Sequence, residues 1–564
     1  MSSPINDDGE NEEKDHLLLA NNNEDKVSKN KLIMIYSLTI GMVLLVIIIV
    51  FLISSNLGNS GNDSKNKNIL YLKYKPDSET ETQLFNPKLI NLIKTMKIDN
   101  KSITNITNIY LFNSTNEVSI ELDLKNNLND IAQLFKNCPK LTEVDLSKLE
   151  IKDVKNMEEM FYGCNSITSI NFGNLKTDKV VNMSYLFYGC IFLSSLQLNN
   201  FNTSNVIDMQ HMFSRCTSIT SLDIKNFDTK NVKEIRGMFS DCKYLTNLEI
   251  PYNFITSNIN DISELFSGCY VLKEINLNNF DTSKVTNMTN LLYDCYSIIS
   301  LDLTKFDTSK VIDMSGLFQG CSGLTSLDLN HLDTSNVEYM SHMFDSCNKL
   351  KTLNIKNLNT SKVKYMNQMF YRCSSIENFD FSNFKTSEVI NMEGMFDFCS
   401  SLKFLNLSNF DTSKVTDMSY LFAASSQLIS VDLSNFNTKQ VITMNNMFYG
   451  CHSLSNLDLS SFDVSNLRSM WVMFYECKSI KNLNLSNFYT TNTEIMGGVF
   501  SKCNNLTILD IRNFDSSSLK FKDTILFSDI SLNGTIYYNS DKFNKSLLNN
   551  SILKDWNKID VFEK

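Results

Sequence analysis

Fourteen cysteines recur along the chain at an almost constant step of 26 residues. The step is 27 residues between Cys242 and Cys269 and 52 between Cys399 and Cys451, where Ser425 occupies the missing position. A fixed period of about 20–50 residues is typical of solenoids, propellers and repeat arrays. The 15 repeats account for most of the 564 residues, so we expect one elongated repeat domain rather than several globular domains.

Each repeat contains two apolar patterns of different period. In the repeat at residues 324–347, LTSLDLNHLDTSNVEYMSHMFDSC, Leu327 and Leu329 flank Asp328, which predicts a short strand with the leucines facing inward. The later apolar positions are spaced as on one face of a helix: Val337, Met340, Met343, Phe344 and Cys347. Thr334 precedes them and could cap that helix. We therefore expect strands on one side of the solenoid and helical segments on the other.

The apolar columns predict a continuous core, because no single repeat can bury its apolar face and neighbouring repeats must stack. Twenty of the 24 methionines fall in two adjacent columns, and Ile235 and Ile262 replace methionine in two places. A metal-binding methionine cluster would need thioethers that converge on one point, whereas isoleucine can replace methionine in packing. We interpret these columns as core.

The complete repeat pattern, LxxLxLSNFDTSxVxxMxxMFxxC, resembles the BspA-like leucine-rich repeats of bacterial and protist surface proteins. The pattern extends over roughly residues 115–515. The resemblance implies an α/β solenoid, a leucine-rich-repeat horseshoe of about fifteen 26-residue repeats. It also implies a binding or adhesive role outside the cell, and it supplies no catalytic residues.

The cysteine column allows three interpretations. Zinc needs four ligands at one point, whereas one cysteine per repeat places the thiols along a line. Disulfides between neighbouring repeats are geometrically marginal, because parallel side chains hold their Cβ atoms too far apart. We therefore predict a buried column of free thiols, in which Ser425 is tolerated. Because free thiols are unusual outside the cell, a cytosolic solenoid remains an alternative.

Residues 32–53 contain no charged side chain and are long enough to span a bilayer as a helix. The run is longer than the apolar region of a cleaved signal peptide, so we expect an uncleaved, single-pass anchor. Three lysines lie at positions 26–31, and the nearest lysine after the run is Lys65. This bias favours a cytoplasmic N-terminus and an extracellular C-terminus.

The tail before this run carries Glu13 four residues ahead of Leu17 and Leu18. The spacing resembles the acidic dileucine sorting signal of eukaryotic membrane proteins, which implies delivery to an endosomal or vacuolar membrane. A chance match in a flexible acidic tail is the alternative.

These features divide the chain into six segments. We predict a cytoplasmic tail at 1–31, a transmembrane helix at 32–53, a stalk at 54–99, an N-terminal cap at 100–137, the leucine-rich-repeat solenoid at 138–518 and a C-terminal cap at 519–564. Caps are expected because a bare terminal repeat would expose its core to water.

The central outward position of the predicted strand is acidic or amide in every repeat, and nine of its residues are carboxylates. Such a negative surface could bind a basic protein, whereas a solvated face that prevents aggregation is the alternative. Calcium is disfavoured, since it needs about 6–8 oxygens at one point. Phe404 replaces a hydroxyl residue on this face and could anchor a partner. The candidate ligand contacts are Asp223, Asp302, Asp328, Asp380, Phe404, Asp432 and Asp458.

Two further departures from the repeat stand out. The 27-residue step falls near Pro251, Tyr252 and Asn253, where the extra residue should bulge the chain at the strand exit, either as a binding loop or by neutral drift. Trp471 replaces a small polar residue on the predicted helical side, either as a partner anchor or as a stray surface aromatic.

Asn-X-Ser/Thr sequons follow the apolar run, and none precedes it. We take Asn105, Asn113, Asn182, Asn287 and Asn533 as candidate glycosylation sites. In a chain this rich in Asn, Ser and Thr, the sequons permit glycosylation without requiring it.

The sequence contains no Gly-rich phosphate loop, no HExxH and no G-x-S-x-G, so we expect neither an enzyme nor a cofactor or metal site. A net charge of −10 argues against a nucleic-acid partner. We therefore expect a membrane-anchored leucine-rich-repeat protein for protein binding or adhesion at the cell surface. A self-associating coat or a cytosolic scaffold is the alternative.

Overall fold

The computed structural model describes residues 68–125, 130–149, 153–520, 525–548 and 553–562. The chain divides into two compact units, 1–66 and 67–564, and only the second unit contains these ranges. The apolar run 32–53 and the sorting residues Glu13, Leu17 and Leu18 therefore lie outside the described residues. Within those residues, no helix is both long and apolar enough to cross a membrane.

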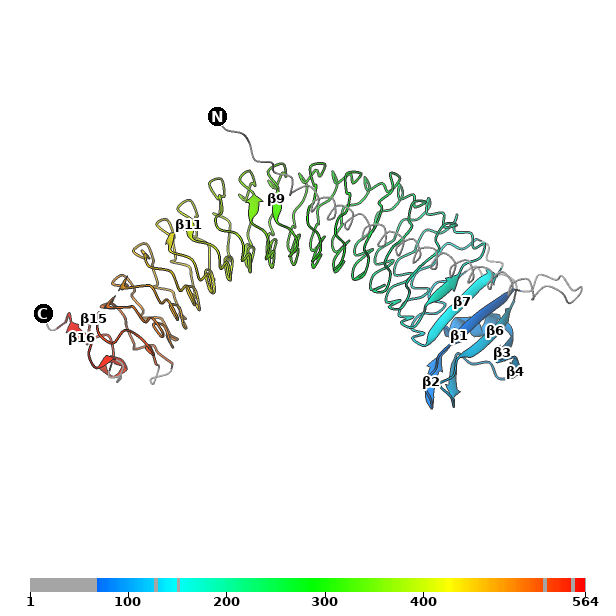
Figure 1. Ribbon diagram of the computed structural model, residues 1–564, viewed down its shortest axis with the longest axis horizontal. Helices are drawn as coiled ribbons and strands as arrows, with labels where there is room; N and C mark the ends of the chain where they lie inside the picture. Colours follow the sequence, from blue (N-terminus) through cyan, green and yellow to red (C-terminus); the bar gives the residue numbers. More distant parts are fainter. Residues whose placement is uncertain (1–67, 126–129, 150–152, 521–524, 549–552, 563–564) are drawn as a thin grey trace, which may run out of the picture. The chain divides into compact units, whose positions relative to one another are not determined.

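The unit 67–564 is a solenoid of about 16 coils that follow one another along a curve (Figure 1). Most coils contribute a three-residue strand or no strand at all, and the part of the chain that the structure describes contains no α-helix. The predicted α/β class is therefore wrong. The short coil strands are β8 (Ser169–Asn171), β9 (Ser326–Asp328), β10 (Thr352–Asn354), β11 (Phe404–Asn406), β12 (Ser430–Asp432), β13 (Asn482–Asn484) and β14 (Ile508–Asp510).

The segment predicted to be helical is a series of turns. The main-chain N–H groups of Met340, His342 and Phe344 donate to carbonyl oxygens of the next coil at 2.9–3.0 Å. In a helix they would donate to the residue four positions back. His342 and Ser346 have φ values of 57° and 60°, which an α-helix does not allow. The left-handed residues turn every second N–H towards the neighbouring coil.

Positions equivalent to His342 and Ser346 are left-handed in nearly every coil. Nine of them are glycines, which adopt positive φ without a steric cost: Gly163, Gly189, Gly237, Gly268, Gly316, Gly320, Gly394, Gly450 and Gly498. Gly237 has a second reason, because a Cβ there would lie 2.4 Å from the ring of His211 in the preceding coil. These two columns explain why an apolar spacing of helical period does not produce a helix.

The core follows the predicted columns. Met340, Phe344 and Cys347 are fully buried, and the equivalent residues are buried in the other coils. The Phe344 ring stacks between Phe318 and Phe370, with centroids 5.6 and 5.5 Å apart. The interpretation of the methionine columns as core is confirmed.

All fourteen cysteines are buried and free, as predicted. Their thiols also hold the coils together, a role that the sequence did not reveal. The Cys347 thiol donates to the main-chain oxygen of Phe318 at 3.2 Å, and other coils repeat this contact. The Ser425 hydroxyl donates to the Phe396 oxygen at 2.7 Å, so the exceptional coil keeps a donor. Burial raises the pKa of Cys216 to about 12, which keeps such thiols protonated.

The predicted helix cap Thr334 instead links two coils. Its buried hydroxyl donates to the carbonyl oxygen of Asn359 in the next coil at 2.9 Å. Equivalent threonines repeat this bond along the solenoid. Val464 replaces the threonine in one coil and is buried like it. The D-T-S motif therefore joins coils rather than starting a helix.

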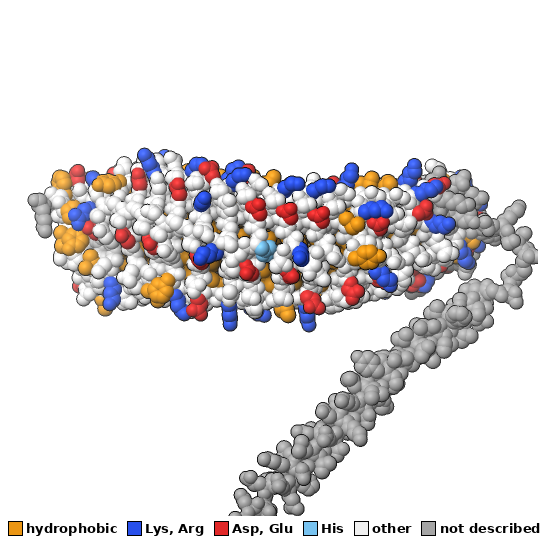
Figure 2. All heavy atoms as spheres, turned by 90° about the horizontal axis from the view of Figure 1, so that it is seen from above, with side chains coloured by type: hydrophobic (Ala, Val, Ile, Leu, Met, Phe, Trp, Pro, Cys, Tyr) orange, Lys and Arg blue, Asp and Glu red, His pale blue; other side chains and the backbone are white. Residues whose placement is uncertain are grey.

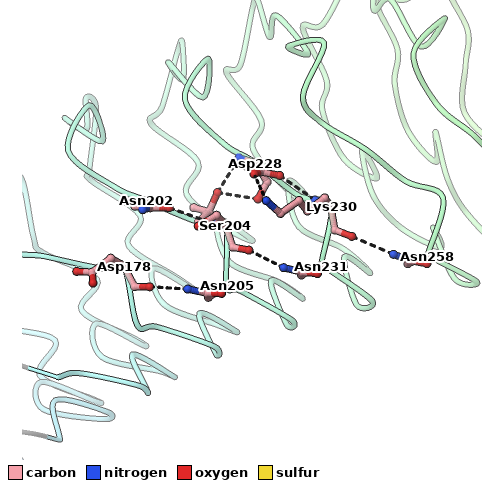
Figure 3. A network of polar contacts seen from close by, with 9 residues as sticks. Asp178, Asn202, Ser204, Asn205, Asp228, Lys230, Asn231 and Asn258 are labelled. Atoms are coloured by element: carbon pink, nitrogen blue, oxygen red, sulfur yellow. Dashed lines mark hydrogen bonds and ion pairs between the residues drawn. The ribbon is translucent and has the colours of Figure 1, made fainter.

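Asparagine side chains add a third set of bonds between coils (Figure 3). Asn205, Asn231 and Asn258 each donate through Nδ2 to a main-chain oxygen of the preceding coil, at 2.7, 2.7 and 2.9 Å. The acceptors belong to Asp178, Ser204 and Lys230. Each amide donates to a turn carbonyl of the preceding coil that would otherwise have no partner in the described part of the protein.

The N-terminal cap is an antiparallel sheet. β1 (Ile69–Tyr74) pairs with β6 (Val118–Leu124) on one edge and with β7 (Leu141–Lys148) on the other. β3 (Ile93–Ile98) extends the sheet from β6, and β4 (Lys101–Ile103) forms its outer edge. β7 also pairs in parallel with β8, which joins the cap to the first coils.

This cap begins earlier than predicted. The segment 54–99 was assigned to a stalk, but it is folded from Ile69 onward. Alternate residues of β1, Leu70, Leu72 and Tyr74, are at most 1% exposed, so this strand has the apolar periodicity of a cap strand. Two further elements lie between β1 and β6 in sequence. They are the antiparallel pair of β2 (Thr80–Gln83) with β5 (Ile109–Phe112), and the 3₁₀ helix η1 (Pro87–Leu92).

The C-terminal segment continues the coil strands. β15 (Thr535–Tyr538) pairs in parallel with β14, and β16 (Asn557–Asp560) pairs with β15, so β13 to β16 form one four-stranded sheet. A 3₁₀ helix, η2 (Lys545–Leu548), lies between β15 and β16 in sequence.

Each coil has two sides that pair differently. On the turn side, at positions equivalent to Tyr339, isolated bridges join ten consecutive coils from Asp261 to Ile495. On the strand side, at positions equivalent to β9, pairing among the described residues occurs only in separate patches. The turn-side ladder breaks between Glu234 and Asp261, in the coil with the 27-residue step. The extra residue therefore disturbs more than the strand exit.

Candidate binding face

The six candidate aspartates all lie exposed on the strand side, and Phe404 is 58% exposed there. One carboxylate oxygen of each aspartate accepts the main-chain N–H two residues later, at 2.9–3.2 Å. These Asx turns fix the chain as it leaves the strand. The acidic column therefore has a structural role, which leaves one oxygen of each carboxylate for other contacts.

Ion pairing divides the candidates into two groups. Asp223 pairs with Lys225 at 2.8 Å, and this contact lowers the pKa of Asp223. Asp380 lies 3.7 Å from the Lys356 ammonium group. The remaining four, Asp302, Asp328, Asp432 and Asp458, have no ion-pair partner among the described residues. Their carboxylates are therefore not neutralised by an ion pair.

One stretch of the strand side is hollowed. A groove of about 570 Å³ lies over residues 247–250, 274–278 and 300–302, and three carboxylates line it: Glu249, Glu274 and Asp302. Its other lining residues are amides, apolar residues and one serine. None of the three carboxylates forms an ion pair with another described residue, so the groove carries uncompensated negative charge.

The groove occurs where the sheet is not paired. Ser221 bridges Asn247, but no described bridge joins residues 247–250 to 274–277, or 274–277 to 300–303. This region directly surrounds the 27-residue step, where the turn-side ladder is also broken. The N–H groups of Gly237, Phe239 and Asp241 still donate to the next coil across this step, so the extra residue removes the bridge at Glu234 without changing the register of the turn side.

Exposed apolar side chains border the groove in sequence on both edges. Tyr252 follows the lining residue Ile250 by two positions and is 89% exposed. Ile299 immediately precedes Ser300 and is 62% exposed, and Tyr244 is 60% exposed. Exposed aromatic residues beside a charged groove are typical of protein-binding surfaces.

A second groove of about 580 Å³ lies near the C-terminal end of the strand side. It is lined by Asp458 and also by Lys481, so its charges compensate each other. The face seen in Figure 2 likewise carries charges of both signs and scattered apolar side chains. The groove at residues 247–302 therefore differs from the second groove in that its lining holds three carboxylates and no lysine or arginine.

The two predicted aromatic anchors lie apart from the groove. Phe404 begins β11, and its register partner on β12 is Ser430. Trp471 is 48% exposed on the turn side, where a Cβ on Gly497 would lie 3.2 Å from its ring. The indole therefore packs against a glycine of the next coil, which explains part of its exposure.

The candidate glycosylation sites fall into two classes. Asn105, Asn113 and Asn533 are exposed in the two caps. Asn182 and Asn287 are half-buried on the turn side, where each Oδ1 accepts the N–H of the sequon hydroxyl residue. Asn287 also donates its Nδ2 to Asp261 at 3.2 Å. In these coils the sequon is a turn motif that aspartate also forms elsewhere.

Glu249, Glu274 and the exposed Tyr252 are the site residues that the candidate set missed. Glu274 occupies the strand position two residues before the acidic column, which the repeat pattern assigns to small polar residues. The signal that could have found it was the 27-residue step. Among the described residues, no group of three or more His, Cys, Asp or Glu side chains could hold a metal ion.

One family model matches nearly all of the described chain. Its description is "Mycoplasma protein of unknown function, DUF285", and it matches residues 82–170, 164–273, 247–326, 297–405, 398–514 and 457–561. The chain belongs to this family. The matches include both grooves and extend from the N-terminal cap into the C-terminal cap. No curated protein matches the chain.

Solved structures of solenoid proteins show distant likeness. The functional domain of InlJ from Listeria monocytogenes, described as including a cysteine ladder, is 15% identical, with 71% of this chain and 74% of that chain covered and a TM-score of 0.20. The Drosophila Toll–Spatzle complex is 12% identical, with 74% of this chain and 46% of that chain covered and a TM-score of 0.21. A TLR13–ssRNA13 complex is 15% identical, with 74% of this chain and 77% of that chain covered and a TM-score of 0.15. These values carry no functional argument.

Proposed function

We propose that this protein is a membrane-displayed recognition solenoid that binds a basic segment of a protein partner on the strand side of residues 247–302. The observation that carries the proposal is the groove lined by Glu249, Glu274 and Asp302, none of which has an ion-pair partner among the described residues. Elsewhere on this side, Asp223 and Asp380 have a lysine within reach.

Lysine or arginine side chains would supply the missing positive charge. Complementary charge of this kind raises the association rate and the selectivity for a partner more than it raises affinity. The attraction weakens as the salt concentration rises, because the charges are screened. The groove is open to solvent, so we expect each exposed pair to contribute about 0.2–1 kcal/mol. The exposed Tyr252, Tyr244 and Ile299 would add apolar contact at the edges.

Binding rather than catalysis is our proposal for this face. The groove lining contains carboxylates, amides, apolar residues and Ser300, but no histidine, cysteine or lysine that could act as a base for that hydroxyl. The resemblance of the repeat to BspA-like surface proteins supports recognition or adhesion in the same way.

A neutralising triple variant tests the binding site. We would change Glu249→Gln, Glu274→Gln and Asp302→Asn in the full-length protein and titrate it with a fluorescent peptide of ten lysines at low salt. The matched control is Asp328→Asn, Asp432→Asn and Asp458→Asn, which removes the same charge from the same face. Asparagine already occupies the equivalent position at Asn354 and Asn406, so the fold should tolerate it.

We expect the groove variant to weaken peptide binding about tenfold and the control to weaken it less than about threefold. Equal losses would show that the peptide responds to the overall charge of the face. In that case the groove would not be the binding site.

Display depends on the apolar run 32–53 acting as an anchor with the solenoid on the far side of the membrane. A tag after Lys564 should be lost when external protease is added to intact cells. Protection of the tag without any glycan would place the repeats in the cytosol and contradict display. If the tail directs internalisation, Leu17→Ala with Leu18→Ala should increase the surface population, and an unchanged distribution would remove that role.

A further inference from the structure

The two-stranded sheet of β2 and β5 leaves the outer edge of β5 open. β2 and β5 form a separate two-stranded sheet, and no other described strand pairs with β5. Leu84 donates its N–H to the Asn108 oxygen at 2.8 Å, which sets the alternation of the antiparallel ladder. Tyr110 therefore directs its main-chain groups towards β2, and Leu111 directs them towards the open edge.

This edge is apolar. β5 has the sequence IYLF and carries no charge. Ile109 and Leu111 are 44% and 54% exposed, whereas Phe112 is buried. An open edge with exposed apolar side chains is a template for pairing with another chain, and natural proteins protect such edges with charge, bulges or a cover. β5 carries neither a charge nor a bulge, so we expect its open edge to be covered.

Sequons stand at both ends of this strand. Asn105 lies four residues before β5, and Asn113 follows it directly. Both asparagines are exposed, and neither side chain forms a hydrogen bond within the described residues. They differ in this from Asn287, whose amide oxygen and nitrogen both bond to neighbouring groups. Their Nδ2 atoms therefore have no competing hydrogen bond, although the hydroxyl of Thr107 in the Asn105 sequon donates to the Ile109 oxygen of β5 at 2.6 Å.

We propose that Asn105 and Asn113 carry N-linked glycans that cover the open edge of β5. The proposal rests on the proposed function, because it needs the solenoid to lie on the side of the membrane where such glycans are added. The glycan donor is an oligosaccharide linked to a polyprenyl diphosphate. The asparagine Nδ2 forms a bond to the anomeric carbon as the bond from that carbon to the diphosphate oxygen breaks, and Nδ2 releases one proton.

A glycan at each end explains how an apolar edge strand stays soluble. The sugars are bulky and hydrated, so they exclude a second strand from the edge between them without disturbing the pairing of β2 with β5. The exposed side chains of Ile109 and Leu111 then remain solvated beneath mobile sugars rather than packed against protein.

Glycopeptide mapping of the full-length protein from cells that add N-linked glycans tests occupancy. We expect both Asn105 and Asn113 to be occupied. The double variant Asn105→Gln, Asn113→Gln should migrate as a chain with two fewer glycans and should self-associate at micromolar concentration. Adding Leu111→Lys to that variant should restore the dispersed form, because it places charge on the open edge. Asn533→Gln is the matched control, since it removes an exposed cap sequon far from β5 in sequence and should leave the protein dispersed.

Four results would overturn the proposal. Occupancy at Asn533 with none at Asn105 and Asn113 would do so while leaving display intact. A double variant that loses both glycans and remains dispersed would show that the glycans do not protect the edge. Absence of glycan from every sequon, with a protease-protected tag, would contradict display itself. Self-association that Leu111→Lys does not reverse would place the contact elsewhere than β5.

Discussion

The two sides of each coil are held together in different ways. On the turn side, main-chain bridges join ten consecutive coils from Asp261 to Ile495, and the buried thiols and threonine hydroxyls bond from coil to coil. On the strand side, pairing is patchy and is absent across the groove at residues 247–302. Cohesion therefore comes from the turn side and the interior, which leaves the strand side free to vary in shape and charge.

The largest expected effect contrasts a core ring with an exposed one. Phe370→Ala removes a buried ring that stacks at 5.5 and 5.7 Å on its neighbours, so it should lower the free energy of unfolding by about 3–5 kcal/mol. Phe404→Ala removes a ring that is 58% exposed on the strand side. This change should alter the free energy of unfolding by less than about 0.5 kcal/mol. Urea unfolding of both variants measures this, and similar losses would mean that the strand side also holds the coils together.

A pH titration tests a weak point of the turn side. Asp397 is buried there with Oδ1 unpaired, and burial raises its pKa to about 7, against partial compensation by the Phe398 N–H and Arg372. The unfolded carboxyl has a pKa of about 3.9, so folding takes up a proton between these values. The contribution of Asp397 to stability should therefore be most favourable below about pH 4, fall as pH rises, and be least favourable above about pH 7.

Asp397→Asn should remove this pH dependence. Above pH 7 the variant should be more stable than the parent by on the order of 3 kcal/mol, and below pH 4 the two should agree. Thermal unfolding across this range measures the difference. A parent whose stability rose between pH 4 and 7 relative to the variant would mean that Asp397 is stabilised as the anion.

The thiol bond between coils predicts a smaller effect. Cys347→Ala removes one of two hydrogen bonds to the buried Phe318 oxygen, which also accepts the Cys321 N–H at 3.0 Å, and should cost about 0.5–1.5 kcal/mol. Cys347→Ser keeps a donor, as Ser425 does naturally, and should cost less. Equal costs for alanine and serine would mean that the cysteine column acts by packing alone. Raised thiol pKa values also predict alkylation only after unfolding.

The smallest effect concerns the inserted residue. Deleting Tyr252 restores a 26-residue step, which should rebuild the bridge from the coil of Glu234 to that of Asp261 and narrow the groove. We expect little change in stability and a several-fold loss of lysine-peptide binding. Unchanged binding of the lysine peptide would show that binding at the groove does not depend on the inserted residue.

The period and the core could be predicted from sequence because stacking gives every interior column one environment. The spacing of Met340, Phe344 and Cys347 identified the buried face correctly. It did not identify the backbone, because the same spacing fits a helix and a series of three-residue turns. Gly316 and Gly320 at two positions four apart were the available evidence against a helix, since each breaks helical geometry.

The candidate site was only partly predictable. The predicted exposure of the acidic column is confirmed for the six candidate aspartates, such as Asp302, but Asp510 in the same column is buried. The sequence could not show which carboxylates lack a cation, because that depends on side chains of neighbouring coils, as for Asp380 and Lys356. The stalk boundary failed for another reason: the β1 strand is a cap strand outside the repeat, so the period gave no signal for it.

Amide hydrogen exchange of the full-length protein, with and without the ten-lysine peptide, tests the central claim most directly. The claim predicts slow exchange at the turn-side amides of Met340 and Phe344, and fast exchange at 247–250, 274–277 and 300–302. It also predicts that the peptide slows exchange only in the latter three segments. Equal protection on both sides of the coil, or slowing spread along the whole strand side, would contradict it.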